Sequence, residues 1–576
     1  MKVLWDYFKK NKWEIISVLV ILSLGLFLRI VTINNYGSLY HDEDYSWYFA
    51  SLKNCFDTIK ELIKVDVHMP LYFIILHFWI KIFPQVPESL HYCSIFLSIA
   101  VIPLSFYLTK KYFNIYAAYF SSILLALNTF CIYYSVYARF YALVLPLSLI
   151  FAFAFLKFIE NSNNKNMVLF IVIHSLLFYT FHLSLIMSFF YALAGLFYLF
   201  YKKKNIKKFL TAYLIIALIS APGIIFILYN LITLSTNLIS HSEEFFRFSN
   251  YAIYDVLENF FANENYQIIF KNPDAYRDLL NNLFNINYCI FVFIPILISL
   301  YAIIKCLFSK NLKLYLFLIP CLLTIATVIL LGKFDIIYYQ TKYLIIIFPA
   351  IVVSCAVGLS LIKDKLVAII VFAVLITINS IYTFTSTLTS STVLNHFSVE
   401  ISDLMTPMEY EFHLQDDDLL IIPFVPNIIK MYISKGKLIP FSFDEGLLLK
   451  DKKSIKFYFG DELYPKLNKD NINDIIAKEV IDKKIHEAYE NNLFEKYIKN
   501  MKTGQKLIIV NPFEVNTGDV KILEYYTPKD CKERKGFIFI TSKVYLDTIK
   551  IAEKYLKSFN EYHNVENGYA IYGYIK

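Results

Sequence analysis

The sequence predicts a polytopic α-helical membrane protein that carries a soluble α/β domain at its C-terminal end. The chain has 576 residues, of which 57% are hydrophobic, and its mean hydropathy is +0.51. Apolar runs recur through the first two-thirds of the chain, and a run of about 18 residues is long enough to cross a hydrocarbon core about 30 Å thick. From about residue 390 the composition changes to dense charge and short β-rich runs. Together these observations exclude an ordinary soluble enzyme.

The apolar runs define eleven candidate spans, at residues 14–32, 90–109, 116–134, 141–159, 167–181, 183–201, 209–231, 286–308, 313–332, 343–361 and 366–386. The segment 70–84 is apolar but short and bounded by prolines, so we interpret it as an interfacial or buried helix. No small-residue cleavage site follows the N-terminal lysines, which favours an uncleaved first span over a signal peptide. The cysteines show no paired spacing, so we expect neither a disulfide framework nor a metal knuckle.

Short lysine-rich loops determine the expected orientation. They lie at residues 8–12, 109–114, 161–166, 201–208, 308–313 and 363–365. The positive-inside rule places all of them, and the N-terminus, in the cytoplasm. Alternation of the spans then places the first loop (33–89), the large loop 232–285 and everything after 387 outside a cell (inner or plasma) membrane. We therefore predict a transmembrane catalytic domain at 1–388 and an extracytoplasmic α/β domain at 389–576.

The first outer loop is predicted to contain amphipathic helices. In residues 45–63 the apolar side chains recur at helical spacing, and charged residues lie on the opposite face. Such helices would lie on the outer membrane surface beside the 70–84 helix. Asp42 stands where the first of them would start, which is a natural N-cap position.

The C-terminal segment alternates strand-like and helix-like patterns. Short β-rich runs occur at 419–425, 454–460, 506–513 and 536–542, and a helical pattern covers 472–499. This alternation is typical of an α/β domain, here of roughly 185 residues.

Ionisable residues embedded in apolar sequence gather on the expected outer face, opposite the lysine-rich loops. They are His41, Asp42, Glu43, Asp44, Asp66 and His68 in the first outer loop, Arg29 near the outer end of the first span, Arg139 after the third span, His182 between the fifth and sixth spans, and Lys333 and Lys342 between the ninth and tenth. Taken singly, each has an ordinary explanation: a solvated turn for 41–44, a packing histidine for His182, head-group contact for Arg139 and an interface anchor for Lys342. Because ionisable groups near a membrane core are costly, their convergence predicts a site.

The residue types indicate the chemistry of that site. A carboxylate pair offers a general base or a metal ligand, and Arg with Lys offers a clamp for phosphate. No nucleotide pool exists outside the cell, so an activated phosphate-bearing substrate there would be anchored in the bilayer by a lipid tail. We therefore expect a polyprenyl-phosphate sugar as the donor, and no nucleic-acid partner. The large outer loop, with Glu243, Glu244, Arg247 and Tyr266, is a candidate for acceptor recognition.

The motifs at 41–50, 66–73, 134–143, 181–182 and 341–349 resemble the bacterial branch of the dolichyl-phosphate-mannose–protein mannosyltransferase family. That family shares the GT-C fold with the lipid A aminoarabinose transferases, and the resemblance covers roughly residues 14–360. It implies that Asp42 is the catalytic carboxylate and Glu43 its acidic neighbour. The remaining positions are implied to bind substrate (His68, Pro70, Tyr134, Tyr141 and Asp44) or the donor phosphate (Arg139, His182, Lys342 and Tyr343).

Lys342-Tyr343 stands where the family has Arg-Tyr, so the charge is kept but the bidentate fork is lost. The related oligosaccharyltransferases carry a Trp-Trp-Asp signature that this sequence lacks, so en bloc transfer to asparagine is not expected.

The reaction implied is the inverting transfer of a single hexosyl or pentosyl unit to a lipid, glycan or protein acceptor, with Asp42 as the base. An ordinary aspartate has a pKa of about 3.9 and is a weak base. Burial or Glu43 must therefore raise its pKa, or a divalent cation (Mg or Mn) at Asp42 and Glu43 must activate the acceptor. We expect no obligatory metal. The alternative function is a flippase or transporter of a polyprenyl-linked glycan, which needs access from both faces, and the sequence shows no inverted repeat for it.

Overall fold

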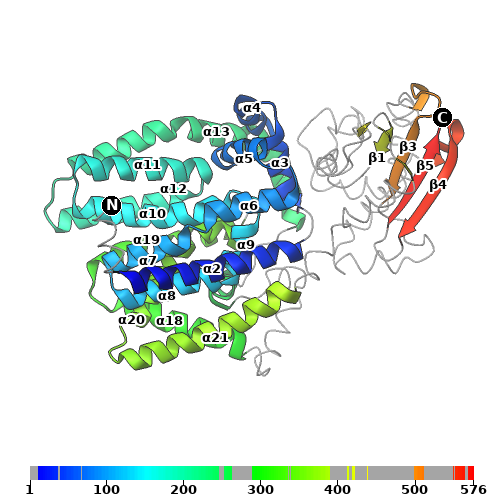
Figure 1. Ribbon diagram of the computed structural model, residues 1–576. Coiled ribbons are helices and arrows are strands. Elements are labelled where there is room, and N and C mark those ends of the chain that lie inside the picture. The colour runs from blue at the N-terminus through cyan, green and yellow to red at the C-terminus, as the bar shows by residue number, and fades with distance from the viewer. Residues whose placement is uncertain are drawn as a thin grey trace. The chain divides into compact units, whose positions relative to one another are not determined.

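The structure is a computed structural model, and its described residues fall into two compact units. One lies within residues 1–233 and 245–396, and the other within 234–244 and 397–576. The first unit is helical and the second contains a sheet (Figure 1). The residues described are 11–36, 39, 41–65, 68–245, 252–262, 289–334, 336–337 and 339–389, then 412–413, 415, 418–421, 437–438, 498–511, 549–550, 552–564 and 569–576.

The helices of the first half of the chain are α2 (Lys12–Tyr36), α3 (His41–Ser51), α4 (Cys55–Val65), α5 (Leu71–Ile82), α6 (Pro87–Ser98), α7 (Val101–Tyr112), α8 (Ile115–Leu127), α9 (Thr129–Val136), α10 (Tyr141–Glu160), α11 (Asn164–Thr180), α12 (Ser184–Tyr201) and α13 (Lys207–Phe245). They are followed by α14 (Ala252–Leu257), the π-helices η1 (Glu258–Ala262) and η2 (Cys289–Phe293), α18 (Ile294–Leu307), α19 (Leu312–Lys333), the 3₁₀-helix η3 (Thr341–Ile346), α20 (Phe348–Ser360) and α21 (Lys365–Thr389). Among the candidate spans α10 is the most buried, with 89% of its most apolar window inside the protein.

The described residues make the chain a multi-pass membrane protein, but they do not confirm the predicted count of eleven spans. Six helical segments are long and apolar enough to cross a membrane, or seven if the bent pair α8–α9 is one span. Each predicted span overlaps a helical segment. Several of these are short, such as α18 with 14 residues and α20 with 13. At about 1.5 Å per residue, such helices cover only about two-thirds of a hydrocarbon core.

The bend between α8 and α9 has a local cause. The two helices meet at 57°, and Asn128 lies between them in extended conformation. Its side-chain oxygen accepts a hydrogen bond from the Cys131 N–H at 2.9 Å, which caps α9. Its amide donates to the Phe260 carbonyl at 2.9 Å. Asn128 therefore ends one helix, starts the next and ties both to η1.

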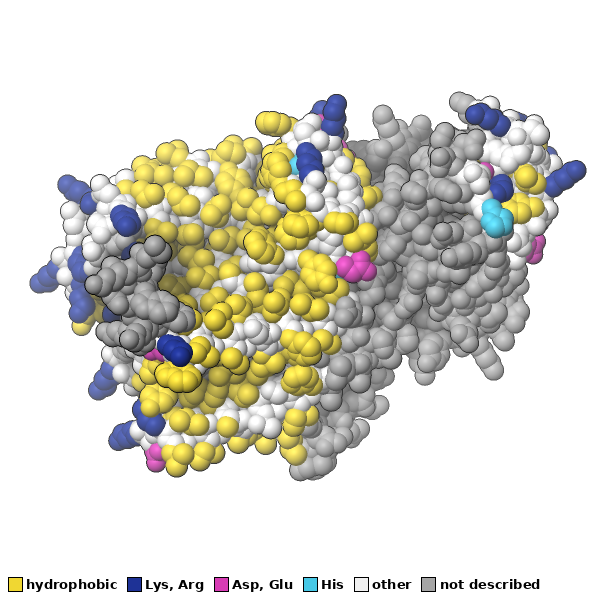
Figure 2. Space-filling view, in the orientation of Figure 1, with side chains coloured by type: hydrophobic (Ala, Val, Ile, Leu, Met, Phe, Trp, Pro, Cys, Tyr) yellow, Lys and Arg dark blue, Asp and Glu magenta, His cyan; other side chains and the backbone are white. Residues whose placement is uncertain are grey.

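The lysine-rich loops lie at one end of the helical unit. Lys313 pairs with Glu160 at 2.5 Å, Lys110 pairs with Glu14, and Asn114 donates to Ser360 at 2.8 Å. These contacts join the ends of α2, α7, α8, α10, α19 and α20. Figure 2 shows many of the basic side chains of the helical unit at that end, further ones over α4, and a wide apolar surface between them. An apolar belt with lysines at one rim is typical of a membrane-embedded bundle.

The first outer loop folds as expected into α3, α4 and α5, which lie together at one end of the helical unit (Figure 1). In the amphipathic α4, Leu62 is 2% exposed. The segment 70–84 forms α5, a helix of twelve residues with a largely buried face. Its His77 Nδ1 lies 2.7 Å from the Ala50 carbonyl of α3. One detail differs: α3 begins at His41, so Asp42 lies in the first turn rather than at the N-cap.

The second unit contains a mixed five-stranded sheet in the order β2-β1-β3-β5-β4. Its strands are β1 (Leu419–Ile421), β2 (Lys437–Leu438), β3 (Lys506–Asn511), β4 (Lys557–Asn564) and β5 (Tyr569–Ile575). β1 pairs in parallel with β2 and β3, whereas β5 is antiparallel to β3 and β4. The predicted strands at 419–425 and 506–513 coincide with β1 and β3. Those at 454–460 and 536–542, and the predicted helix 472–499 up to residue 497, lie outside the described residues, and the 388/389 boundary stays a prediction.

Candidate functional site

Glu43 is fully buried in the first turn of α3. Its Oε1 accepts a hydrogen bond from the Ala138 N–H at 2.6 Å and lies 3.4 Å from His91 Nδ1 of α6. The same imidazole nitrogen lies 3.0 Å from the Val136 carbonyl. A buried carboxylate needs such partners, because desolvation of an unpartnered charge is expensive. Glu43 therefore ties the start of α3 to the loop between α9 and α10.

The other acidic residues of the predicted site flank this anchor. The backbone of Asp42 and of Asp44 lies in the first turn of α3, one residue to either side of Glu43. The side chains of His41, Asp42 and Asp44 are outside the part of the chain that the structure describes. The contacts of Glu43 thus place the backbone that carries Asp42 beside residues 136–138.

Arg139 lies in the short loop between α9 and α10 and is 4% exposed. Its Nη1 is 3.4 Å from Ser46 Oγ of α3, and its Nη2 is 3.5 Å from His68 Nε2. The guanidinium carbon lies 5.9 Å from the ring centroid of Phe73 and 5.5 Å from that of Phe140. Aromatic faces attract a cation electrostatically. Arg139 is thus a buried cation between the first outer loop and α10.

Lys342, in η3, lies beside the aromatic ring that follows Phe140 in the sequence. Its Nζ lies 5.8 Å from the ring centroid of Tyr141, the first residue of α10. Arg139 and Lys342 therefore contact the successive rings Phe140 and Tyr141, although about two hundred residues separate them in the sequence. The tyrosine ring stacks further on Tyr137 at 6.2 Å and meets Tyr134 edge-on at 5.2 Å.

Phe181, at the C-terminal end of α11, connects the remaining predicted residues. Its ring lies 5.1 Å from Phe140, 5.6 Å from His182 and 6.2 Å from Tyr343. The His68 ring lies 4.9 Å from Phe140 on another side, and Pro70 follows as the N-cap of α5. The structure thus brings His68, Arg139, His182, Lys342 and Tyr343 together around one aromatic cluster.

Several buried polar residues near the predicted site were not identified from the sequence. His91 and Ser46 give no signal of their own, because they are single polar residues in helical patterns. Asp255 and Glu258, of α14 and η1, are 2% and 1% exposed, and their signal in the sequence is a charge within an apolar segment. Burial raises the pKa of the Tyr339 phenol, and the nearby Asp255 carboxylate raises that pKa further. Asp255 therefore lies close to the segment that leads to Lys342.

The loop residues proposed to recognise the acceptor are not placed. The side chains of Glu243, Glu244, Arg247 and Tyr266 lie outside the described residues. Within the described side chains, no three His, Cys, Asp or Glu residues lie close enough together to hold a metal ion. Asp42 and Asp44 are not among those side chains.

An almost wholly apolar groove of about 420 Å³ begins at Pro70, two residues after His68. The Tyr179 hydroxyl donates to the Ile219 carbonyl at 2.7 Å and joins α11 to α13, two of its walls. The groove is lined by Pro70, Leu71, Ile74, Ile171, Val172, Ser175, Leu176, Tyr179 and Ile219.

The whole chain resembles solved membrane glycosyltransferases in structure. ArnT from Cupriavidus metallidurans bound to undecaprenyl phosphate matches with a TM-score of 0.52 and 10% identity over 98% of each chain. The apo form of the same protein matches with 0.51 and 11% identity, again over 98% of each chain. The apo oligosaccharyltransferase of Archaeoglobus fulgidus matches with 0.51 and 13% identity, over 97% of this chain and 74% of that one. The predicted GT-C fold is thereby confirmed.

Neither sequence comparison adds to this. No protein-family model matches the chain, and no curated protein matches it.

Proposed function

We propose that the protein transfers a single sugar from a polyprenyl-phosphate donor to an acceptor at the end of the helical unit opposite the lysine-rich loops. One observation carries the proposal: Arg139 and Lys342 contact successive rings at the start of α10. Glu160, the last residue of α10, lies at the lysine-rich end. A helix of 20 residues is about 30 Å long, so the two ends lie on opposite sides of a bilayer core.

The two cations would bind the donor phosphate. Both lie against aromatic rings, in a low-dielectric surrounding where their charge acts strongly on an anion. Arg139 offers a fork of N–H donors and Lys342 a single ammonium group. Undecaprenyl phosphate is the molecule bound to the similarly folded ArnT, which supports a donor of this class. The outward orientation of this end follows from the positive-inside rule.

The apolar groove beside Pro70 would hold the first isoprene units of the donor. It starts next to His68, which contacts Arg139, so a phosphate at Arg139 and a tail in the groove belong to one continuous ligand. The nine lining residues offer one hydroxyl besides the tyrosine, that of Ser175. Such a wall suits a hydrocarbon chain.

In the proposed reaction the acceptor oxygen attacks the anomeric carbon of the sugar, with inversion. Its proton passes to the Asp42 carboxylate, and the polyprenyl phosphate leaves with the electrons of the broken carbon–oxygen bond. Arg139 and Lys342 would stabilise the charge on the leaving group. Glu43 would act as the anchor of the α3 first turn, because one of its oxygens is already engaged by Ala138 and faces His91. We propose no metal bridge between Asp42 and Glu43 for the same reason.

The test is transfer from a radiolabelled polyprenyl-phosphate sugar in membranes, with the wild type and Asp42→Asn expressed equally. We expect the variant to bind donor but to lose transfer by about a thousand-fold or more. Asp57→Asn is the matched control, because it makes the same change in α4 of the same loop at a residue outside the proposed site, and we expect a far smaller loss. Intact transfer by Asp42→Asn would show that the base lies elsewhere. Donor movement across the membrane without any transfer would favour the flippase.

A further inference from the structure

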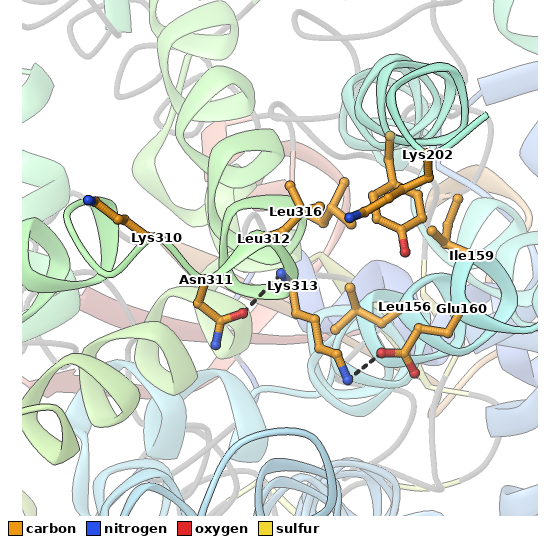
Figure 3. Close-up of a pocket in the computed structure, with 10 residues that line it drawn as sticks. Leu156, Ile159, Glu160, Lys202, Lys310, Asn311, Leu312, Lys313 and Leu316 are labelled. Atoms are coloured by element: carbon orange, nitrogen blue, oxygen red, sulfur yellow. Dashed lines mark hydrogen bonds and ion pairs between the residues drawn. The ribbon is translucent and has the colours of Figure 1, made fainter. Parts of the chain in front are cut away.

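A second pocket lies at the lysine-rich end of the helical unit, away from the proposed catalytic site. It has a volume of about 450 Å³ and lies between the end of α10, the end of α12 and the start of α19 (Figure 3). Its lining residues are Leu156, Ile159, Glu160, Tyr198, Lys202, Lys310, Asn311, Leu312, Lys313 and Leu316. The glycosyltransferase proposal assigns no role to any of them.

The pocket carries excess positive charge. Three lysines and one carboxylate line it, so its formal charge is 3 − 1 = +2. Glu160 is paired with Lys313 at 2.5 Å, which leaves Lys202 and Lys310 without a carboxylate among the lining residues. Figure 3 shows the Lys202 side chain extending between Leu316 and Ile159, whereas the Lys310 side chain lies apart on the rim and points away from the other labelled residues. The N-terminal end of α19 adds the positive end of a helix dipole.

Hydrogen bonds hold the pocket walls in place. Lys204 Nζ donates to the carbonyls of Ile159 and Glu160, at 3.2 and 3.1 Å, and ties the loop after α12 to the end of α10. The Lys310 N–H donates to the Tyr315 hydroxyl at 3.0 Å, and that hydroxyl donates to the Leu307 carbonyl at 2.9 Å. The site is therefore formed before a ligand arrives, which lowers the entropy cost of binding.

The surroundings of the pocket indicate a lipid. Five of its ten lining residues are apolar or aromatic. Exposed aromatic side chains lie near its lining residues in the chain: Phe200 is 65% and Tyr201 67% exposed at the end of α12, and Phe308, two residues before Lys310, is 81% exposed. Aromatic rings beside lysines at the ends of apolar helices mark the level of the head groups. A phosphate that binds here would thus sit at head-group depth, with an apolar wall below it for acyl chains.

We propose that this pocket binds the head group of an anionic phospholipid. Its phosphodiester would contact Lys202, Lys310 would add electrostatic attraction from the rim, and its acyl chains would lie along Leu156, Leu312 and Leu316. The positive-inside rule predicts that the lysine-rich end, and with it the pocket, lies at the cytoplasmic leaflet. Anionic lipids of that leaflet attract lysines near the membrane surface. The inference is independent of the proposed transferase, because it uses none of the residues of that site.

The experiment is native mass spectrometry of the full chain in detergent, titrated with phosphatidylglycerol or with phosphatidylcholine of the same acyl chains. The double variant K202Q/K310Q tests the pocket. K111Q/K363Q removes two exposed lysines from the same end outside the pocket and is the matched control. We expect K202Q/K310Q to weaken phosphatidylglycerol binding by about thirty-fold, from about 1 kcal/mol for each lysine. The control should change it by less than about three-fold.

A second measurement needs no variant. Phosphatidylglycerol should raise the midpoint of thermal unfolding of the wild type, and phosphatidylcholine should raise it less. Three results would overturn the proposal: equal losses in the two double variants, equal binding of the two lipids, or displacement of phosphatidylglycerol by millimolar inorganic phosphate. The first two would indicate general attraction to the bilayer, and the third a site for a free anion.

Discussion

The cations beside the two ends of α10 lie in different environments. At its start, Arg139 is 4% exposed and lies between the rings of Phe73 and Phe140. At its other end, the side chains of Lys313 and Glu160 are 49% and 35% exposed and form an ion pair. A buried cation against aromatic rings acts in low-dielectric surroundings, whereas an exposed pair is screened by water. The same helix therefore connects an end suited to chemistry with an end suited to orientation in the membrane.

After the loss of transfer expected for Asp42→Asn, the largest expected effect is at Arg139. Arg139→Ala should lower sugar transfer by about a hundred- to a thousand-fold, since it removes a preorganised donor group from the leaving phosphate. Arg139→Lys should recover part of the loss, because it keeps the charge without the fork. Transfer assays in membranes with matched expression measure both. Lys363→Ala, at the lysine-rich end, is the control, and an equal loss in that variant would contradict the contrast between the two ends.

The next effect concerns the anchor at Glu43. Glu43→Ala should lower the free energy of unfolding by about 1–3 kcal/mol, because the buried Ala138 N–H loses its acceptor. Glu43→Gln keeps an acceptor of the same shape and should cost less. Thermal unfolding in detergent measures both variants. If Glu43→Ala leaves the midpoint unchanged while transfer is abolished, Glu43 takes part in the chemistry itself rather than in holding α3.

Lys342 should contribute less to transfer than Arg139. Lys342→Met should weaken donor binding by about ten-fold, which corresponds to about 1.4 kcal/mol. Lys342→Arg should bind the donor at least as well as the wild type, because the guanidinium offers a fork that the ammonium lacks. Binding of the polyprenyl-phosphate donor to purified protein measures these differences. A Lys342→Met variant with wild-type donor affinity would remove Lys342 from the phosphate site.

The smallest expected effect is at the opposite end. Lys313→Met should change the free energy of unfolding by at most about 1 kcal/mol, since exposed ion pairs contribute little. The effect should shrink further as salt rises. Thermal unfolding at low and high salt checks this expectation. A loss as large as that of Glu43→Ala would show that the pair is a structural element rather than a surface contact.

Sequence patterns predicted most of the membrane architecture. The positions of the apolar helices, the lysine-rich ends and the amphipathic α4 follow from hydropathy and periodicity, which are local properties of the chain. The bend at Asn128 and the short α18 and α20 were not predicted, because hydropathy does not report where a helix is interrupted. In the C-terminal unit the polar β4 carries little strand signal, and its pairing with β5 depends on contacts distant in sequence.

The sequence by itself determined which residues carry charge and at which end of the membrane unit they lie. It singled out Glu43, Arg139, His182 and Lys342 because ionisable groups in apolar surroundings are expensive and therefore conspicuous. Only the tertiary structure decided their partners: Glu43 with Ala138 and His91, and Arg139 and Lys342 with the successive rings of Phe140 and Tyr141. Partners are decided by packing between helices distant in sequence, and that packing depends on shapes that no local pattern records.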